Sequence, residues 1–301
     1  MFRQSIIITL FIIIAIAIFQ ANIVSFDKSL SKSFEADKKS DEPIKSDLNR
    51  KKEARGTIPV DKEPVFVLVL DDFGYSEKNL EKVADMGISM TIAVLPNAPF
   101  SGKICSFSEQ NGIETILHLP MEPGENTKFL ETNTLDETMS DDEIMSIVRN
   151  GFFSVFSAKG VSNHMGSKAT KDERIVNIVF DEIKKRKMYF LDSFTTQDSV
   201  CEEISLKKGI PYVKRDIFID NNAEEAYIEK QLLTAEIMAR EKDFVVALGH
   251  DRRITIDVLS KIIPQLRIRG IKFLTISEFI KKQEGKRDSL ELVSTSTNYE
   301  L

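Results

Sequence analysis

Cysteine and histidine are scarce in this chain of 301 residues, which contains two cysteines and three histidines. Cys105 and Cys201 form neither a CxxC pair nor a zinc-knuckle spacing, so they give no sign of a zinc ribbon. They could form one disulfide, but we expect two buried thiols. Basic residues make no long stripe and the net charge is −6, which gives no indication of a nucleic-acid partner.

What the sequence does have is a long apolar run near its start, SIIITLFIIIAIAIF, with Arg3 in front of it. A helix needs about 20 mostly apolar residues to cross a bilayer, and the run reaches this length if the weaker stretch to Phe26 is counted. We see no small-x-small cleavage site, so we predict a signal anchor over 1–26, with a cleaved signal peptide as the alternative. Either one predicts an exported, extracytoplasmic or periplasmic protein, and the anchor would hold it to the cytoplasmic membrane.

Composition divides the remaining chain into three parts. Residues 27–63 are rich in Lys, Asp, Glu and Ser, which predicts a disordered polar linker. Residues 283–301 are similarly polar and predict a flexible tail. Between them, 64–282 has the size of a single α/β barrel.

Short apolar runs alternate with amphipathic segments in this domain. The strand-like runs are 65–70, 90–95, 114–119, 160–164, 188–193, 212–219, 244–249 and 272–276, and helical periodicity appears for example over 77–87, 141–156, 172–187, 223–242 and 255–270. Most of the strand-like runs are continuously apolar, as in strands that are covered on both faces. The rhythm predicts a barrel of seven or eight mainly parallel strands, with an open doubly wound sheet as the alternative.

All three histidines and several aspartates lie near the ends of these runs. The histidines are His118, His164 and His250, and the acidic residues are Asp71, Asp72, Asp192, Asp216 and Asp220. Since parallel strands bring their carboxyl ends to one face, we expect these side chains to gather there. Carboxylates and imidazoles together are what a hydrolytic metal site requires.

The adjacent pair Asp71–Asp72 ends the first strand. In a regular strand only one carboxylate would face inward, whereas a turn beginning there would let both approach one cavity, one as a metal ligand and one as a base. The alternative is that Asp72 or Ser76 caps the following helix.

The next motifs supply groups of mixed chemistry. His118 and Glu122 are four residues apart, so on a turn or short helix they could reach a common point as metal ligands or as an acid–base pair. Asn163, His164 and Ser167 could orient a polar substrate or make an ordinary Asx turn.

The later strand ends carry further acids and the last histidine. Asp192 and Ser193 end the fifth strand. Asp216 belongs either to the site or to an ion pair with Arg215. His250 has the placement of a general acid or base.

In this order, LDDFGYS, LHLPMEP, NHMGSKAT, FLDSFTT, RDIFIDN and LGHD resemble the divergent polysaccharide deacetylase family, a distant branch of the NodB-like carbohydrate esterases, over about 64–280. The resemblance implies a distorted (β/α) barrel and metal-dependent removal of N-acetyl groups from a cell-envelope polysaccharide or peptidoglycan-type glycan. It also implies that Asp71 is the base and Asp72 a metal ligand.

The chain departs from the family pattern at four places. The RxPxG-like motif of the broader family is missing, with NHMGS in its place. The H-x-x-x-H motif of the broader family has Glu122 at its second histidine, so the third ligand is either Glu122 or His164. The arginine that often follows LDS in the divergent branch is replaced by Phe194. The proline that often follows Gly-His is replaced by Asp251.

From the motifs and the resemblance we expect a divalent cation, Zn²⁺, on Asp72, His118 and Glu122, and His250 as the acid that protonates the departing amine. Either of two acids would orient its ring, Asp192 or Asp216. The sugar would be held by Asn163, His164, Ser167 and Ser193. An alternative function is a catalytically inactive glycan-binding or envelope scaffold with a cell-wall enzyme as partner, and a further one is hydrolysis of another C–N or ester bond.

Overall fold

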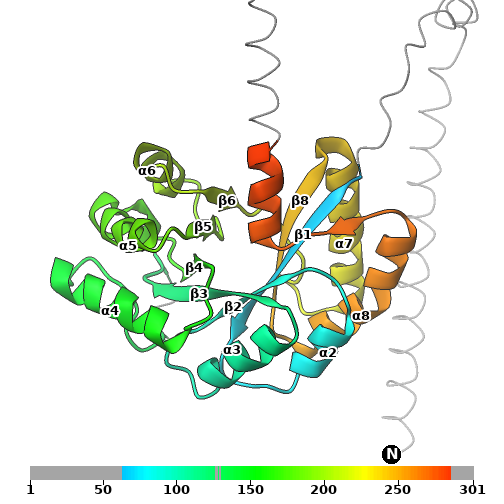
Figure 1. Cartoon of the computed structure of the whole chain (residues 1–301), viewed down its shortest axis with the longest axis horizontal. Coiled ribbons are helices and arrows are strands. Elements are labelled where there is room, and N and C mark those ends of the chain that lie inside the picture. Colours follow the sequence, from blue (N-terminus) through cyan, green and yellow to red (C-terminus); the bar gives the residue numbers. More distant parts are fainter. Residues whose placement is uncertain (1–62, 126–127, 129, 286–301) are drawn as a thin grey trace, which may run out of the picture. The chain divides into compact units, whose positions relative to one another are not determined.

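The computed structural model describes residues 63–125, 128 and 130–285 (Figure 1). The predicted anchor or signal peptide (1–26), the linker up to residue 62 and the tail from residue 286 lie outside the described residues. Within the part that is described, no helix is long and apolar enough to cross a membrane. A helix over 276–285 continues past the predicted end of the domain at 282.

In the described residues, nine parallel strands form one sheet. They are β1 (Val65–Phe73), β2 (Thr91–Val94), β3 (Glu114–Met121), β4 (Gly160–Met165), β5 (Tyr189–Asp192), β6 (Tyr212–Lys214), β7 (Ile217–Phe218), β8 (Phe244–His250) and β9 (Lys272–Phe273). Eight follow the order β6-β5-β4-β3-β2-β1-β8-β7, and β9 pairs with the start of β1. This curled parallel sheet confirms the predicted distorted barrel.

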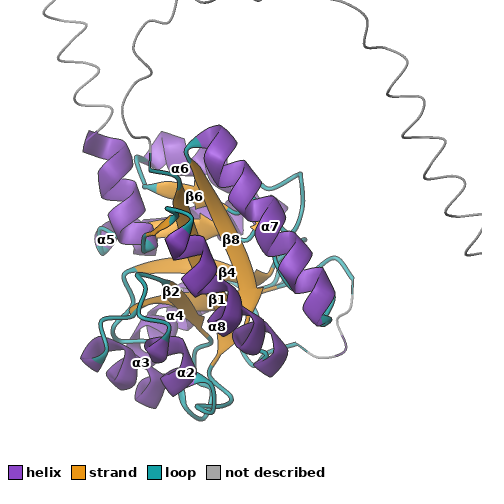
Figure 2. Ribbon diagram, turned by 90° about the vertical axis from the view of Figure 1, so that its right-hand side faces the viewer, coloured by secondary structure: helices purple, strands orange, loops and turns teal. Residues whose placement is uncertain are grey.

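Besides the helix over 276–285, seven α-helices of the described residues alternate with the strands and cover the outer side of the sheet (Figures 1 and 2). They are α2 (Leu80–Asp85), α3 (Ser101–Gln110), α4 (Asp141–Ser154), α5 (Glu173–Lys185), α6 (Cys201–Lys208), α7 (Glu225–Lys242) and α8 (Arg253–Ile268). Local sequence fixes some of their starts. Ser140 and Glu143 form a capping box at α4, in which each side chain bonds the other residue's backbone N–H.

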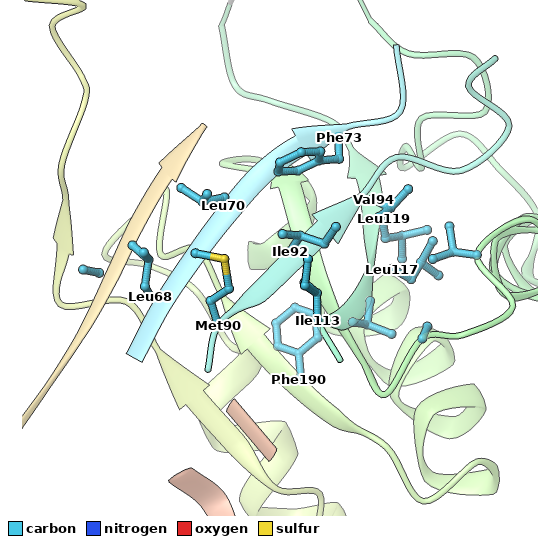
Figure 3. Close-up of a cluster of buried hydrophobic side chains, with 14 of the residues drawn as sticks. Leu68, Leu70, Phe73, Met90, Ile92, Val94, Ile113, Leu117, Leu119 and Phe190 are labelled. Carbon is cyan, nitrogen blue, oxygen red and sulfur yellow. The ribbon is translucent and has the colours of Figure 1, made fainter. Parts of the chain in front are cut away.

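The central strands are buried on both faces, which explains why most of the strand-like runs are continuously apolar. Along β1, alternate residues such as Leu68 and Leu70 belong to the outer core beneath the helices (Figure 3). The residues between them, such as Val67 and Val69, face a smaller inner core, which the segment 274–280 covers. The inner core fills the barrel between the described strands.

The predicted strand 212–219 is in fact two short strands at opposite ends of the sheet. The backbone N–H of Arg215 donates to Asp192 O at the end of β5 (3.1 Å), and that of Asp216 donates to Val246 O on β8 (2.9 Å). The barrel therefore has a gap between β6 and β7, and these two residues cross it.

Both cysteines are buried free thiols. Burial raises the pKa of Cys105, and it raises that of Cys201 to well above its usual range. The expectation of two thiols is confirmed.

Candidate active site

A bulge in β1 brings both adjacent aspartates to the same pocket. Leu70 pairs with Ile92 and Phe73 with Val94, so three steps along β1 match two along β2. Asp72 takes the left-handed conformation, with φ 65°. A bulge of this kind changes the direction of the side chain that would otherwise alternate outward. The predicted turn is thus a bulge within the strand. As expected, it lets both carboxylates approach the same cavity.

The helix-capping alternative for Asp72 and Ser76 is wrong. Helix α2 begins after Asn79, which makes no side-chain cap. The hydroxyl of Ser76 instead accepts the backbone N–H of Lys78 (3.2 Å).

His118 and His164 come from neighbouring strands. His118 pairs with Ser162 in the β3–β4 register, so His164 lies two residues further along the same face. The Nδ1 atom of His118 is 2.8 Å from the Ser162 hydroxyl, and its Nε2 atom is 3.2 Å from His164 Nδ1. A neutral His118 that offers Nε2 to a cation carries its proton on Nδ1, which then donates to Ser162.

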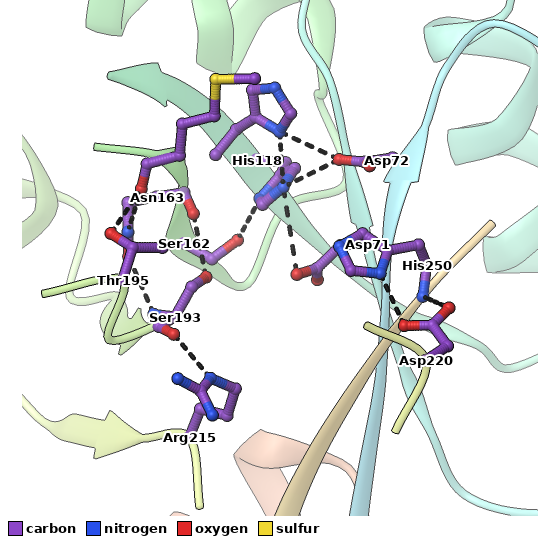
Figure 4. Close-up of polar contacts among 12 residues, drawn as sticks. Asp71, Asp72, His118, Ser162, Asn163, Ser193, Thr195, Arg215, Asp220 and His250 are labelled. Carbon is purple, nitrogen blue, oxygen red and sulfur yellow. Dashed lines mark hydrogen bonds and ion pairs between the residues drawn. The ribbon is translucent and has the colours of Figure 1, made fainter. Parts of the chain in front are cut away.

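Asp72 completes a group with the two histidines (Figure 4). Its Oδ1 atom is 3.3 Å from His118 Nε2 and 2.9 Å from His164 Nδ1. Burial opposes ionisation of Asp72, but the hydrogen bonds and charges of both histidines outweigh it and hold its pKa well below the usual range. Ligand atoms about 2.0–2.1 Å from one tetrahedral zinc ion lie roughly 3.3 Å apart. The three side chains therefore fit a divalent cation with shifts of a few tenths of an ångström.

Glu122 does not belong to this group. Strand β3 continues to Met121, so His118 and Glu122 lie along an extended backbone. Four residues of extended chain span about 13 Å, which is too far for two ligands of one ion. Glu122 instead accepts a bond from Lys168 (3.1 Å). Of the two candidates for a third ligand, the structure brings His164 to the site.

Asp71 lies on the other side of His118, with 4.0 Å between Asp71 Oδ2 and His118 Nε2. Its Oδ1 atom is buried and has no hydrogen-bond partner among the described residues. Burial raises the pKa of Asp71, and the neighbouring charges of His118 and His250 offset this only in part. Asp71 is therefore a buried carboxylate whose Oδ1 atom can accept a proton.

His250 faces Asp71 across the β1–β8 pairing. Its Nδ1 atom is 2.7 Å from Asp220 Oδ1, and its backbone N–H donates to Asp220 Oδ2 (2.9 Å). The Thr255 hydroxyl also donates to Asp220 (2.7 Å), which is fully buried. Burial lowers the pKa of His250, but the hydrogen bond and charge of Asp220 outweigh it and raise the pKa overall.

Asp220, rather than Asp192 or Asp216, therefore orients the imidazole of His250. Asp192 is fully buried and accepts bonds from Phe194 N (2.7 Å) and the Ser199 hydroxyl (2.7 Å), so it shapes the loop after β5. Asp216 accepts the backbone N–H of Val246 (2.8 Å) and lies 3.7 Å from Lys242. The predicted pair between Asp216 and Arg215 is not formed.

The polar residues expected to hold a sugar join β4 to its neighbouring loops. Asn163 Oδ1 accepts the Ser193 N–H (2.9 Å), and the Ser193 hydroxyl donates to Asn163 O (2.9 Å). Their exposures are 0% and 3%, so a sugar cannot touch Asn163 and scarcely reaches Ser193. The Ser167 hydroxyl accepts the Gly124 N–H (2.9 Å) at the rim. His164 belongs to the cation group instead.

The fold and site together define a parallel α/β barrel with an Asp–His–His group and an Asp-supported histidine at its carboxyl edge. The family model of the divergent polysaccharide deacetylases matches residues 68–280. The chain belongs to this family, as the motifs indicated.

Relatives and solved structures agree with this fold. The chain is 35% identical over 199 residues to the uncharacterized protein YibQ of Escherichia coli K12, covering 66% of this chain and 62% of that protein. An uncharacterized Haemophilus influenzae protein is 31% identical over 192 residues, covering 64% and 68%. ATU2773, an uncharacterized protein of Agrobacterium tumefaciens C58, superposes with a TM-score of 0.68 at 20% identity, covering 73% of this chain and 91% of that one. The peptidoglycan deacetylase PdaC of Bacillus subtilis gives 0.50 at 13%, covering 78% and 99%.

Proposed function

We propose that this protein is a metal-dependent deacetylase that hydrolyses N-acetyl groups of a cell-envelope polysaccharide or peptidoglycan-type glycan. One observation carries the proposal: the bulge in β1 directs Asp72 to two imidazoles and leaves Asp71 between that group and His250. Membership of a polysaccharide deacetylase family supports the substrate class.

A divalent cation, for which we propose Zn²⁺, would be held by Asp72, His118 and His164. Such a cation would polarise the acetyl carbonyl and would lower the pKa of the attacking water. The hydrogen bond from His118 to Ser162 fixes the ring so that Nε2 faces the other two ligand atoms.

Asp71 acts as the general base. Its buried Oδ1 atom is free to accept the proton that the attacking water loses. Burial favours the protonated form of this carboxyl, so proton transfer to it is easier than to a solvated aspartate.

His250 acts as the general acid. Because its Nδ1 atom faces Asp220, the nitrogen left for the substrate is Nε2. When the C–N bond breaks, His250 gives its proton to the departing amine, and the acyl group leaves as acetate. The negative charge of Asp220 stabilises the protonated ring before this transfer.

The proposed substrate suits the expected location. We propose that residues 1–26 direct the protein out of the cytoplasm, and that their apolar run holds it at the membrane next to its glycan.

The experiment is acetate release from peptidoglycan and from N-acetylglucosamine oligomers by the zinc-loaded full chain. We expect Asp71→Asn to lower the rate by about 10²–10⁴-fold, the usual contribution of a general base, and to leave zinc binding unchanged. Glu122→Gln, a nearby carboxylate outside the group, is the matched control and should stay within a few-fold. An undiminished rate in Asp71→Asn would overturn its role. Zinc binding without acetate release from any acetylated glycan would favour the binding scaffold, and release from simple acetyl esters alone would favour an esterase.

A further inference from the structure

Arg215 lies where the sheet is open. It follows β6, and the next residue but one begins β7 at the other end of the strand order. Its side chain reaches back to the loop after β5, where Nε donates to Ser193 O (2.7 Å) (Figure 4). Its Nη2 atom donates to Phe194 O (3.0 Å). The planar guanidinium thus holds two successive carbonyls with a fixed geometry, which a lysine cannot reproduce.

The same guanidinium also packs on an aromatic ring. Its Cζ atom is 3.8 Å from the ring centroid of Phe218. The Phe218 ring in turn stacks on His250, with 5.7 Å between centroids and 15° between the planes. Arg215, Phe218 and His250 therefore form one series of contacts from the β5 loop to β8.

This series supplies what Asp220 alone does not. The bond between Asp220 and His250 Nδ1 fixes one edge of the imidazole, but a ring held at one edge can still tilt about that bond. A flat neighbour in contact with the ring restricts the tilt. Phe218 is such a neighbour. Arg215 packs against its ring and is itself held by hydrogen bonds to the carbonyls of Ser193 and Phe194.

We propose that Arg215 is a positioning residue for the deacetylation reaction: it fixes the plane of the His250 ring through Phe218. The inference rests on the proposed function only in assigning His250 as the acid. A catalytic group displaced by about 1 Å can cost about 10²-fold in rate, so small changes in tilt matter.

The first test reads the imidazole directly and needs no substrate. The chain has three histidines, so the full-length protein labelled at histidine gives three sets of ring signals, and His250→Gln identifies one of them. We expect Arg215→Gln and Phe218→Leu each to shift the His250 signals and to leave those of His118 and His164 in place. Lys214→Gln is the matched control, since it removes one positive charge from the adjacent residue, whose ammonium lies instead over Phe194 at 4.8 Å. Unchanged His250 signals in Arg215→Gln would overturn the inference whether or not the protein is an enzyme.

The second test is kinetic and uses the same variants. We expect Arg215→Gln to lower kcat by about 10-fold to 10²-fold with KM and zinc affinity nearly unchanged, because the defect lies in proton transfer and not in binding. Arg215→Lys should not restore kcat, because it keeps the charge and loses the planar fork.

A double variant shows whether Phe218 transmits the effect. If it does, Arg215→Gln combined with Phe218→Leu should be about as slow as the slower single variant. Multiplying effects on kcat would overturn the relay and indicate two independent contributions. Failure of the natural protein to release acetate would count against the proposed function alone, since the ring signals still decide the positioning.

Discussion

The third ligand of the cation group can be tested by a pair of substitutions, His164→Ala and Glu122→Gln. In the structure, the distances among Asp72 Oδ1, His118 Nε2 and His164 Nδ1 are 2.9, 3.2 and 3.3 Å. These are close to the roughly 3.3 Å between ligand atoms of one tetrahedral zinc ion. Glu122 instead accepts a hydrogen bond from Lys168 through one carboxylate oxygen.

The magnitude follows from what one ligand contributes. Four-ligand zinc sites bind with about 10–16 kcal/mol, which is roughly 3 kcal/mol for each ligand. His164→Ala removes one ligand and should therefore raise the Kd for zinc by about 10²-fold. Glu122→Gln should change it by no more than about threefold.

The assay is competition for Zn²⁺ between the full chain and a chelator of known affinity, read at one pH because ligand protonation changes the apparent Kd. The thermal midpoint of each metal-free variant, compared with that of the natural protein, shows that the fold survives. A large loss in Glu122→Gln together with normal binding in His164→Ala would refute the geometry and restore Glu122 as the ligand that its spacing suggested.

Two further predictions follow from buried contacts. The charge of Asp220 raises the pKa of His250 against the opposing effect of burial, and turnover requires the protonated ring, so activity is lost as pH rises through that pKa. Asp220→Asn should therefore move the alkaline limb of the kcat profile to lower pH, and an unmoved limb would contradict the assignment. In Gly160→Ala the new Cβ would lie 2.4 Å from the buried Tyr189 ring, so we expect a loss of about 1–3 kcal/mol in urea unfolding. Gly102→Ala, in α3 with open space around it, should instead gain about 0.5–1 kcal/mol, and equal effects would contradict the packing argument.

The fold was largely predictable because strands that are buried on both faces consist mainly of consecutive apolar residues. The runs 65–70 and 244–249 are continuously apolar and correspond to β1 and β8. The division of 212–219 was not predictable, because both halves have strand-like composition. Which edge each half joins depends on distant partners, Asp192 for Arg215 and Val246 for Asp216.

The sequence predicted most of the residues that lie at the site, but it predicted less well which of them contact one another. The parallel topology alone was enough to predict that acids and histidines at strand ends lie close together. This prediction was correct for Asp72 and His118. The partner of His250 was missed because Asp220 precedes it by thirty residues and nothing local links the two. The available signal was the position of Asp220, which directly follows the strand-like run 212–219.

The error at Glu122 shows why spacing alone misleads at a strand end. The interval from His118 to Glu122 suits a helix, on which residues four apart share a face about 6 Å apart. In an extended strand the same interval separates them by about 13 Å. A second imidazole must then come from a neighbouring strand, and His164 on β4 satisfies this because its register places it diagonally next to His118. Where β3 ends therefore decides which residue completes the cation group, and the substitution of Glu122 for the family's second histidine does not by itself imply a lost metal.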